Sequence, residues 1–256
     1  MPTTRRALAA IPAVPMAVAG AVVYQVLRAA HRPDLPSFSN QDPAGTFGNP
    51  ALSPLRMVAL GDSSITAPGV EDLDNAWVRR IAIALSDEFH VDLMSVAVGG
   101  SKARDVIAGQ LDEAVRLEPD IAILSVGAND AIRATPPDRY RSEIQHIVSE
   151  LDRTSGAIVV LGVGDLGSIP RLPPLLRRIL TRRAARFNSA AASITAQFPN
   201  AVKVPTTGPM STAFWQDHEL FAGDLFHASD KGHGLFAEQM LPAIRAALVV
   251  HDSADS

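Results

Sequence analysis

Short apolar runs alternate with stretches of helical spacing along most of this chain, and that alternation constrains the fold more than any other feature. Five runs have the character of strands: residues 56–60, 91–98, 121–126, 157–163 and 202–204. Helical patterns follow them, at about residues 75–89, 103–117, 137–151, 174–198 and 230–249. Buried strands that alternate with helices form one parallel sheet covered on both faces. The sequence therefore predicts an α/β domain with a five-stranded parallel sheet.

The first 54 residues differ in character from this domain. Residues 7–27 are almost unbroken small and apolar residues behind Arg5 and Arg6. Two interpretations fit: a cleavable signal peptide with Ala17-Val18-Ala19 as its cleavage site, or an uncleaved anchor of about 20 residues. A buried helix or a disordered tail is the remaining alternative.

Residues 32–54 are rich in proline and polar residues and show no period, which is typical of a linker. The sequence thus predicts a signal peptide or membrane anchor over residues 1–31, a linker over 32–54 and a folded domain over 55–250. We expect that domain to be exported, either secreted or anchored on the outer face of the membrane through residues 7–27.

The composition excludes several kinds of functional site. The chain has 256 residues and no cysteine, which excludes disulfides, thiolate metal sites and a cysteine nucleophile. Its net charge is −4, and no basic run is interleaved with aromatic residues, so we expect no nucleic-acid partner. Other side chains, such as serine, histidine, the carboxylates and the amides, are therefore the candidates for chemistry.

Residues of these types gather where the predicted strands end. The segments concerned are Gly61-Asp62-Ser63-Ser64, Val98-Gly99-Gly100-Ser101, Gly127-Ala128-Asn129-Asp130 and, in the loop after the last strand, Asp224-Leu225-Phe226-His227. Ligands of such sheets bind at the carboxyl ends of the strands. A serine there can act as a nucleophile, glycine N–H groups and an asparagine amide can bind an oxyanion, and histidine can act as base. Taken singly, each segment also fits an ordinary turn.

The choice of base is the main ambiguity, because the chain has seven histidines. Asp224 precedes His227 by three residues and can turn back to fix its tautomer. His218 lies in the same loop and is the serious rival, although Asp217 beside it lacks that spacing. The other histidines lie just before the linker, in the tail or in and beside regular elements, and His233 starts the last helix.

Together and in this order, the four segments resemble the sequence blocks of the SGNH hydrolases, also called GDSL esterases, over about residues 55–249. Ser64 and Ala228 depart from the commoner leucine and proline. The resemblance implies a flavodoxin-like three-layer α/β/α fold and serine-dependent hydrolysis of carboxylic esters, with no metal or cofactor. It implies Ser63 as nucleophile, His227 as base and Asp224 as its partner. The oxyanion hole would comprise the N–H groups of Ser63 and Gly100 and the Asn129 side chain.

Several alternatives remain at this stage. Gly162 to Gly167 match G-x-G-x-x-G, but no helix follows at once and no acid lies about 20 residues on, so we expect a loop beside the site rather than a dinucleotide cofactor. Hydrolysis assisted by a metal on Asp62, Asp130, Asp224 and His227 is a second alternative, and a non-catalytic binding module is a third. We expect a small-molecule or lipid acyl ester as partner, with acetylated glycans and thioesters also open.

Overall fold

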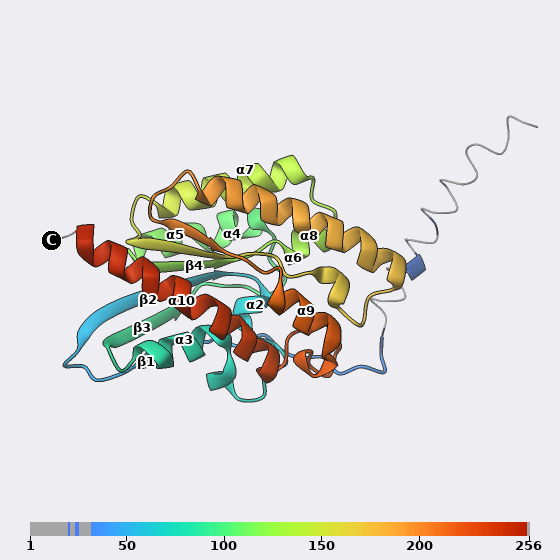
Figure 1. Ribbon diagram of the computed structural model, residues 1–256, viewed down its shortest axis with the longest axis horizontal. Coiled ribbons are helices and arrows are strands. Elements are labelled where there is room, and N and C mark those ends of the chain that lie inside the picture. Colours follow the sequence, from blue (N-terminus) through green and yellow to red (C-terminus); the bar gives the residue numbers. More distant parts are fainter. Residues whose placement is uncertain (1–19, 21–23, 26–31, 255–256) are drawn as a thin grey trace, which may run out of the picture.

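A six-stranded sheet forms the centre of the molecule (Figure 1). The computed structural model describes residues 20, 24–25 and 32–254. The strands are β1 (Gly45–Phe47), β2 (Ser53–Gly61), β3 (Phe89–Ser95), β4 (Ile121–Ser125), β5 (Ala157–Leu161) and β6 (Ala201–Val204), in the spatial order β1-β3-β2-β4-β5-β6. Strands β2 to β6 pair in parallel, which confirms the five predicted strands.

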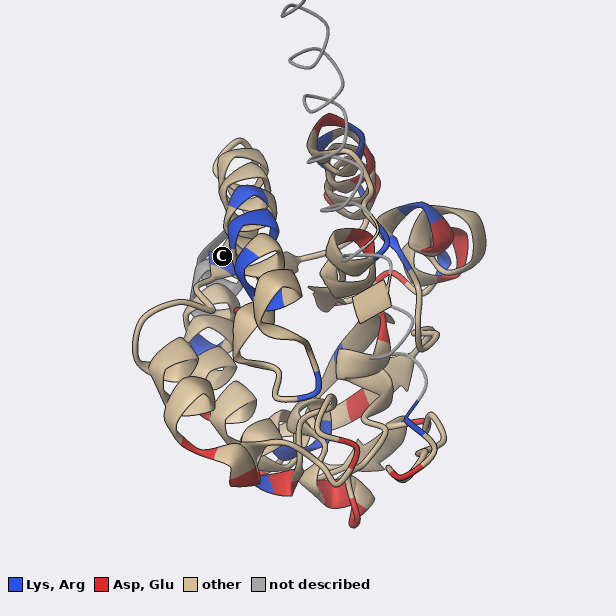
Figure 2. Cartoon of the chain, turned by 90° about the vertical axis from the view of Figure 1, so that its right-hand side faces the viewer, with Lys and Arg blue, Asp and Glu red and all other residues tan. Residues whose placement is uncertain are grey.

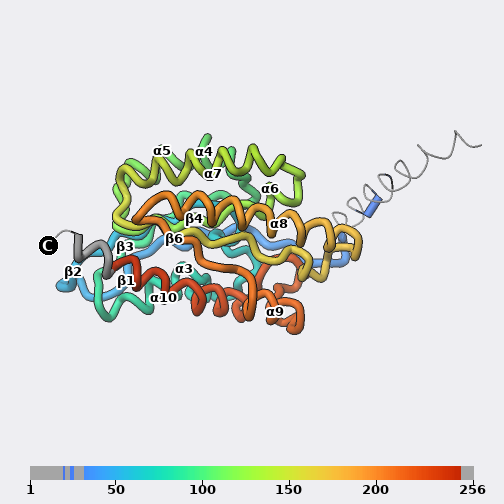
Figure 3. Tube along the Cα trace, turned by 45° about the horizontal axis from the view of Figure 1, so that its top comes forward, coloured from blue at the N-terminus to red at the C-terminus, as the bar shows by residue number. Residues whose placement is uncertain are grey.

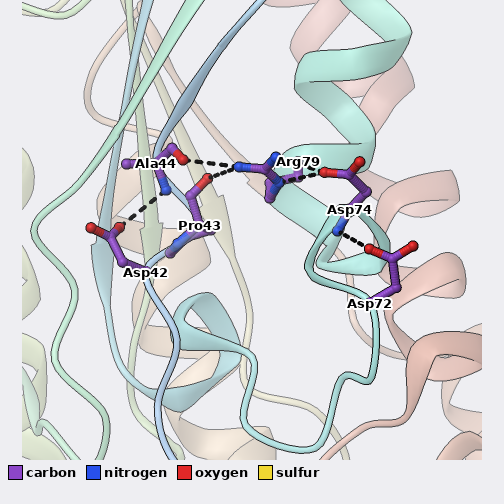
Figure 4. A network of polar contacts seen from close by, with 6 residues as sticks. All are labelled: Asp42, Pro43, Ala44, Asp72, Asp74 and Arg79. Carbon is purple, nitrogen blue, oxygen red and sulfur yellow. Dashed lines mark hydrogen bonds and ion pairs between the residues drawn. The ribbon is translucent and has the colours of Figure 1, made fainter.

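The sixth strand, β1, was not predicted and lies inside the expected linker. It pairs antiparallel with β3, from Gly45 opposite Leu93 to Phe47 opposite Val91. Arg79 fastens this segment from the neighbouring helix, because its guanidinium donates to the carbonyls of Pro43 and Ala44 and to Asp74 (Figure 4). Residues 43–47 therefore belong to the folded domain.

Helices cover both faces of the sheet (Figures 1 and 3). One face carries α3 (Trp77–Leu85) and α10 (Asp230–Ala254), and the other carries α4 (Ala103–Gly109), α5 (Leu111–Arg116), α7 (Pro137–Leu151) and α8 (Pro174–Thr195). Shorter elements join them: α2 (Ser63–Thr66), α6 (Ala128–Ile132), α9 (Pro209–Gln216) and the 3₁₀ turns η1 (Leu73–Asn75), η2 (Leu166–Ser168) and η3 (His218–Leu220). The three-layer α/β/α prediction is confirmed.

The two cores follow from the alternation of side chains along each strand. On β2, Met57 and Ala59 face α3 and α10, whereas Val58 and Leu60 face the opposite layer. All four are fully buried. A strand buried on both faces needs apolar residues at every position, which explains the unbroken apolar runs in the sequence.

One predicted helix is divided in the structure. Residues 103–117 form α4 and α5, and the break falls at the buried residue Gln110. Its side-chain oxygen accepts the Gly61 N–H, and its side-chain nitrogen donates to the Gly61 carbonyl. This pair of bonds holds the end of β2 in place.

The strand order places a crevice at one end of the sheet. In chain order the parallel strands are arranged second, first, third, fourth and fifth, so the connections change direction between β2 and β4. Ligands bind outside the carboxyl ends of strands at such a switch point. The short helices α2 and α6 begin there, at the right-hand end of the sheet in Figure 1.

The predicted signal peptide or anchor lies almost wholly outside the described residues, and it stays a prediction. Within the part of the chain that the structure describes, no helix is long and apolar enough to cross a membrane.

Candidate active site

The turn from β2 into α2 presents Ser63 at the edge of the sheet. Gly61 has φ of 145°, and a Cβ on it would lie 1.9 Å from the Ser125 carbonyl oxygen, so only glycine fits. The next residue, Asp62, caps α2 by accepting the Ser64 N–H at 3.0 Å. Ser63 is therefore the first residue of the helix and is partly exposed. The Ser64 hydroxyl is engaged with the Ser125 hydroxyl at 2.5 Å.

Asp62 also reaches the end of β4. It is buried, and the Asn129 amide nitrogen lies 3.4 Å from its second oxygen. Burial raises the pKa of Asp62 to about 6, although the bonds from Ser64 and Asn129 act in the opposite direction. The residue next to Ser63 in sequence thus contacts the Asn129 amide.

Of the two glycines after β3, Gly100 is open to a ligand. A Cβ on Gly99 would collide with the Asn40 side chain at 1.9 Å, so Gly99 is packed closely. Gly100 has φ of 82°, and a Cβ on it would meet only Arg133, at 3.7 Å. Gly100 is therefore partly exposed and has open space where a side chain would lie.

A tight loop holds Asp224 and His227 together. The Nδ1 atom of His227 lies 2.7 Å from one Asp224 carboxylate oxygen, and the backbone N–H groups of Phe226 and His227 donate to the other. Leu225 adopts φ of 58° to make this turn. Burial acts to raise the pKa of Asp224, but the bonds from His227 and Phe226 outweigh it and lower the pKa. Asp224 is thus held ionised against the imidazole.

Ser63 and His227 line the same cavity, of about 150 Å³. Its remaining wall is mostly apolar and comes from the segment around η2, from α9, from the loop of residues 221–228 and from the start of α10. Its large side chains include Leu166, Ile169, Met210, Phe214, Phe226 and Phe236. Among the described residues, no hydrogen bond joins Ser63 and His227. Bonds between catalytic groups often tighten only once substrate binds.

The rival histidine, His218, is exposed on η3 and does not line this cavity. Asp217, its neighbour, is instead paired with Lys231 at 2.6 Å. The structure therefore brings His227, rather than His218, to the cavity that holds Ser63.

The G-x-G-x-x-G segment forms a wall of the cavity, as expected of a loop beside the site. Asp165 accepts the Gly167 N–H at 3.0 Å, the Thr181 hydroxyl at 2.6 Å and the Trp215 indole N–H at 2.8 Å. These bonds join η2, α8 and α9. Gly167 lies in the 3₁₀ turn, and Gly162 and Gly164 lie in the irregular stretch before it. None of the three opens an α-helix, so this segment does not have the dinucleotide-binding geometry.

Helix α8 carries arginines and no acidic residue (Figure 2). Its arginines form only partly a solvated face. Arg177 lies over the Trp215 ring and donates to the Gly167 carbonyl, and Arg183 donates to the carbonyls of Ala131 and Thr135. The exposed members are Arg178, Arg182 and Arg186.

The carboxylates considered for a metal site have other partners. Among the described residues, no three His, Asp or Glu side chains gather closely enough to hold a metal ion. Asp130 is fully buried and accepts the Ala103 N–H at 2.9 Å, which connects the end of β4 to the start of α4.

Sequence reasoning missed His233 as a residue of the site. It lies in the first turn of α10, is 2% exposed and lines the cavity with His227. Its place at the start of the last predicted helix, six residues beyond His227, was the available signal.

Solved structures show the same fold at low identity. TesA has a TM-score of 0.63 and 18% identity, covering 75% of this chain and 99% of that one. The acetylxylan esterase Axe2 from Geobacillus stearothermophilus has a TM-score of 0.59 and 18% identity, covering 75% and 94%. LAE5, an α/β hydrolase enzyme from the Lake Arreo metagenome, has a TM-score of 0.61 and 20% identity, covering 77% and 96%.

Sequence comparisons give the family. A GDSL-like esterase of Mycobacterium tuberculosis is 30% identical over 202 residues, which are 76% of this chain and 63% of that protein. The chain thus spans somewhat less than two thirds of this curated relative. The model of the GDSL-like lipase/acylhydrolase family matches residues 59–235, which include Ser63, Asn129 and His227. This chain belongs to the GDSL-like lipase/acylhydrolase family.

Proposed function

We propose that this protein is a serine-dependent hydrolase of carboxylic esters. The observation that carries the proposal is the His227–Asp224 contact of 2.7 Å on the wall of the cavity that Ser63 also lines. With Nδ1 bound to the carboxylate, Nε2 is the nitrogen left to accept a proton. The presence of both Ser63 and His227 also disfavours a non-catalytic module.

The residues would act in two stages. His227 accepts the Ser63 hydroxyl proton while Ser63 Oγ attacks the ester carbonyl, and the negative charge develops on the carbonyl oxygen. The Ser63 and Gly100 N–H groups and the Asn129 amide stabilise that oxyanion. The intermediate collapses to an acyl-serine, and His227 gives its proton to the leaving alcohol. Water then attacks the acyl-serine with His227 again as base, and the acid is released.

The cavity favours an acyl group larger than acetyl. An apolar cavity of similar size, about 150 Å³, is known to hold benzene. A chain of roughly four to eight carbons would therefore occupy the cavity found here, whereas acetyl would leave most of it empty. An ester and a thioester carry the same acyl group and differ only in the leaving atom. The wall of the acyl cavity therefore does not discriminate between them.

The test compares Ser63→Ala with Ser64→Ala on p-nitrophenyl esters of two to twelve carbons. Ser63→Ala should lower kcat by about 10⁴–10⁶, the range seen when a triad residue is removed. Ser64→Ala is the matched control and should keep most of the activity, since its hydroxyl is engaged with Ser125. Activity retained in Ser63→Ala, or labelling of Ser64 alone by an organophosphorus probe, would overturn the proposal.

A further inference from the structure

His233 is fixed by the start of a neighbouring helix. Its Nδ1 atom accepts the backbone N–H of Trp77, the first residue of α3, at 3.2 Å. No side chain of the preceding residue, Ala76, caps α3, so this imidazole satisfies one of the N–H groups that a helix start leaves free. The ring also packs edge-on against Phe236, with centroids 5.7 Å apart.

That contact decides which nitrogen of His233 carries the proton. A neutral imidazole has one acceptor and one donor nitrogen, so a ring that accepts at Nδ1 must donate at Nε2. Burial lowers the pKa of His233 to about 3, and the ring therefore stays neutral over the physiological range. His233 presents a permanent N–H donor rather than a second base.

The free edge of the ring belongs to the cavity. His233 lines the cavity, and its Nε2 atom has no hydrogen-bond partner among the described residues. Nε2 is also not fully enclosed, because it is absent from the set of described side-chain atoms that are both enclosed and unpartnered. The other lining donors are mostly used: Ser64 is engaged with Ser125, Ser168 donates to the Asp165 carbonyl, and Thr206 donates to the Val163 carbonyl. Ser211, partly exposed on α9, is the remaining hydroxyl apart from the Ser63 nucleophile.

We propose that His233 Nε2–H binds the substrate, and that the cavity selects acyl groups carrying a hydrogen-bond-accepting oxygen, such as an ether, ketone or hydroxyl, along an otherwise apolar chain. This inference rests on the proposed ester hydrolysis. A buried donor without a partner disfavours an all-carbon chain, whereas an oxygen at the right position satisfies it.

The first test is an oxygen scan of the acyl chain. In a series of hexanoyl p-nitrophenyl esters, each methylene beyond the α-carbon is replaced in turn by an ether oxygen. The wild type should show a peak of about fivefold or more in kcat/KM at one position relative to its neighbours, as one hydrogen bond supplies. The peak in kcat/KM should come from a lower KM rather than a higher kcat, because the contact is made both in the bound substrate and in the transition state.

Variants test whether His233 causes that peak. In His233→Asn the amide oxygen can still accept the Trp77 N–H, but no donor reaches the place of Nε2, so the peak should disappear. His233→Gln can extend a donor to that place and should retain part of it. Ser211→Ala and the exposed His146→Asn on α7 are controls that should leave the peak at its position. A peak that persists in His233→Asn, or that is lost in Ser211→Ala instead, would overturn the inference.

A second readout needs neither turnover nor a His233 variant. In ¹⁵N-labelled Ser63→Ala protein, the Nε2 resonance of His233 should shift with the favoured ether ester and not with the hexanoyl ester. If the esters are hydrolysed but the oxygen scan is flat and the resonance does not shift, this inference alone is wrong. If no ester is hydrolysed, the proposed function is wrong. A reciprocal series carries the ether oxygen in the alcohol half of the ester. If the favoured oxygen lies there, His233 is still a donor to the substrate, but the proposed position of the oxygen in the acyl group is wrong.

Discussion

Two carboxyl groups of the site differ in pKa because their surroundings differ. The pKa of buried Asp62 is raised to about 6, since burial outweighs the weak bond from Asn129 and the bonds from Ser64. The pKa of Asp224 is lowered, since three donors from its own loop outweigh burial. Asp224 therefore stays ionised to a lower pH than Asp62 does, which suits a residue that stabilises an imidazolium.

Removing that charge should have a large effect on turnover. Asp224→Asn keeps the size of the side chain but favours the wrong tautomer of His227, and the serine-protease precedent for this change is about 10⁴ in kcat. Steady-state kinetics checks the value. His218→Ala is the matched control and should stay active. If His218→Ala abolished activity while His227→Ala kept most of it, the assignment of the base would be wrong.

The stability of the fold should report on His233. Its pKa is about 3 in the folded state and about 6.5 when unfolded, so only the unfolded chain binds a proton between these values. The stabilisation is complete above pH 6.5 and is lost, at about 1.4 kcal/mol per pH unit, as the pH falls toward 3.

His233→Gln cannot bind that proton, so its free energy of unfolding should fall less steeply from pH 6.5 to 4.5 than that of the wild type. Urea unfolding at several pH values measures both slopes. The opposing slope from Asp62 is common to the two proteins and cancels in the comparison. His146→Gln, on an exposed histidine, should run parallel to the wild type, and a parallel His233→Gln curve would contradict the expectation.

Among the elements, the turn from β2 to α2 is the least tolerant of change. In Gly61→Ala the new Cβ meets the Ser125 carbonyl in a left-handed backbone conformation, so we expect a loss of roughly 3 kcal/mol or more in the free energy of unfolding. Gly109→Ala on α4 is the control: its Cβ meets nothing within 4 Å, and alanine should stabilise the helix by about 0.5–1 kcal/mol. Thermal unfolding of both variants checks the contrast, and equal midpoints would refute it.

The elements that the sequence predicts are those with a strong local pattern. The five parallel strands are apolar at nearly every position, and α3 repeats its buried residues every turn. The break at Gln110 was missed because its cause is the Gly61 backbone, 49 residues away. Three-residue β1 is too short to show a period, and α9 lies in a stretch that we expected to be an irregular loop.

The residues of the site also fall into those that the sequence predicts and those that it does not. Ser63, Gly100 and Asn129 follow strands, so the topology of a parallel sheet brings them to one edge and the sequence can predict their meeting. The cavity wall could not be predicted, because η2, α9 and α10 are brought together by contacts such as Trp215–Asp165 between distant segments. The role of His233 depends on a backbone N–H of α3, which no local pattern reveals.

For the whole molecule, we propose that the apolar segment of residues 7–27 governs location and that the domain lies outside the cytoplasmic membrane. Arg5 and Arg6 before the segment favour a cytoplasmic N-terminus, although Arg28 and Arg32 after it act against that orientation. Protease added to intact cells should digest a tethered domain, or the domain should be found in the medium. Full protection in intact cells without released protein would contradict the proposal.

The two tryptophans of the chain also link the cavity to an optical signal. The buried Trp77 donates its indole N–H to the Ser64 carbonyl at 2.7 Å, and Trp215, 45% exposed, donates to Asp165. Both acceptors belong to residues that line the cavity. Intrinsic fluorescence should therefore change when the cavity fills, which lets binding be followed in the unlabelled protein.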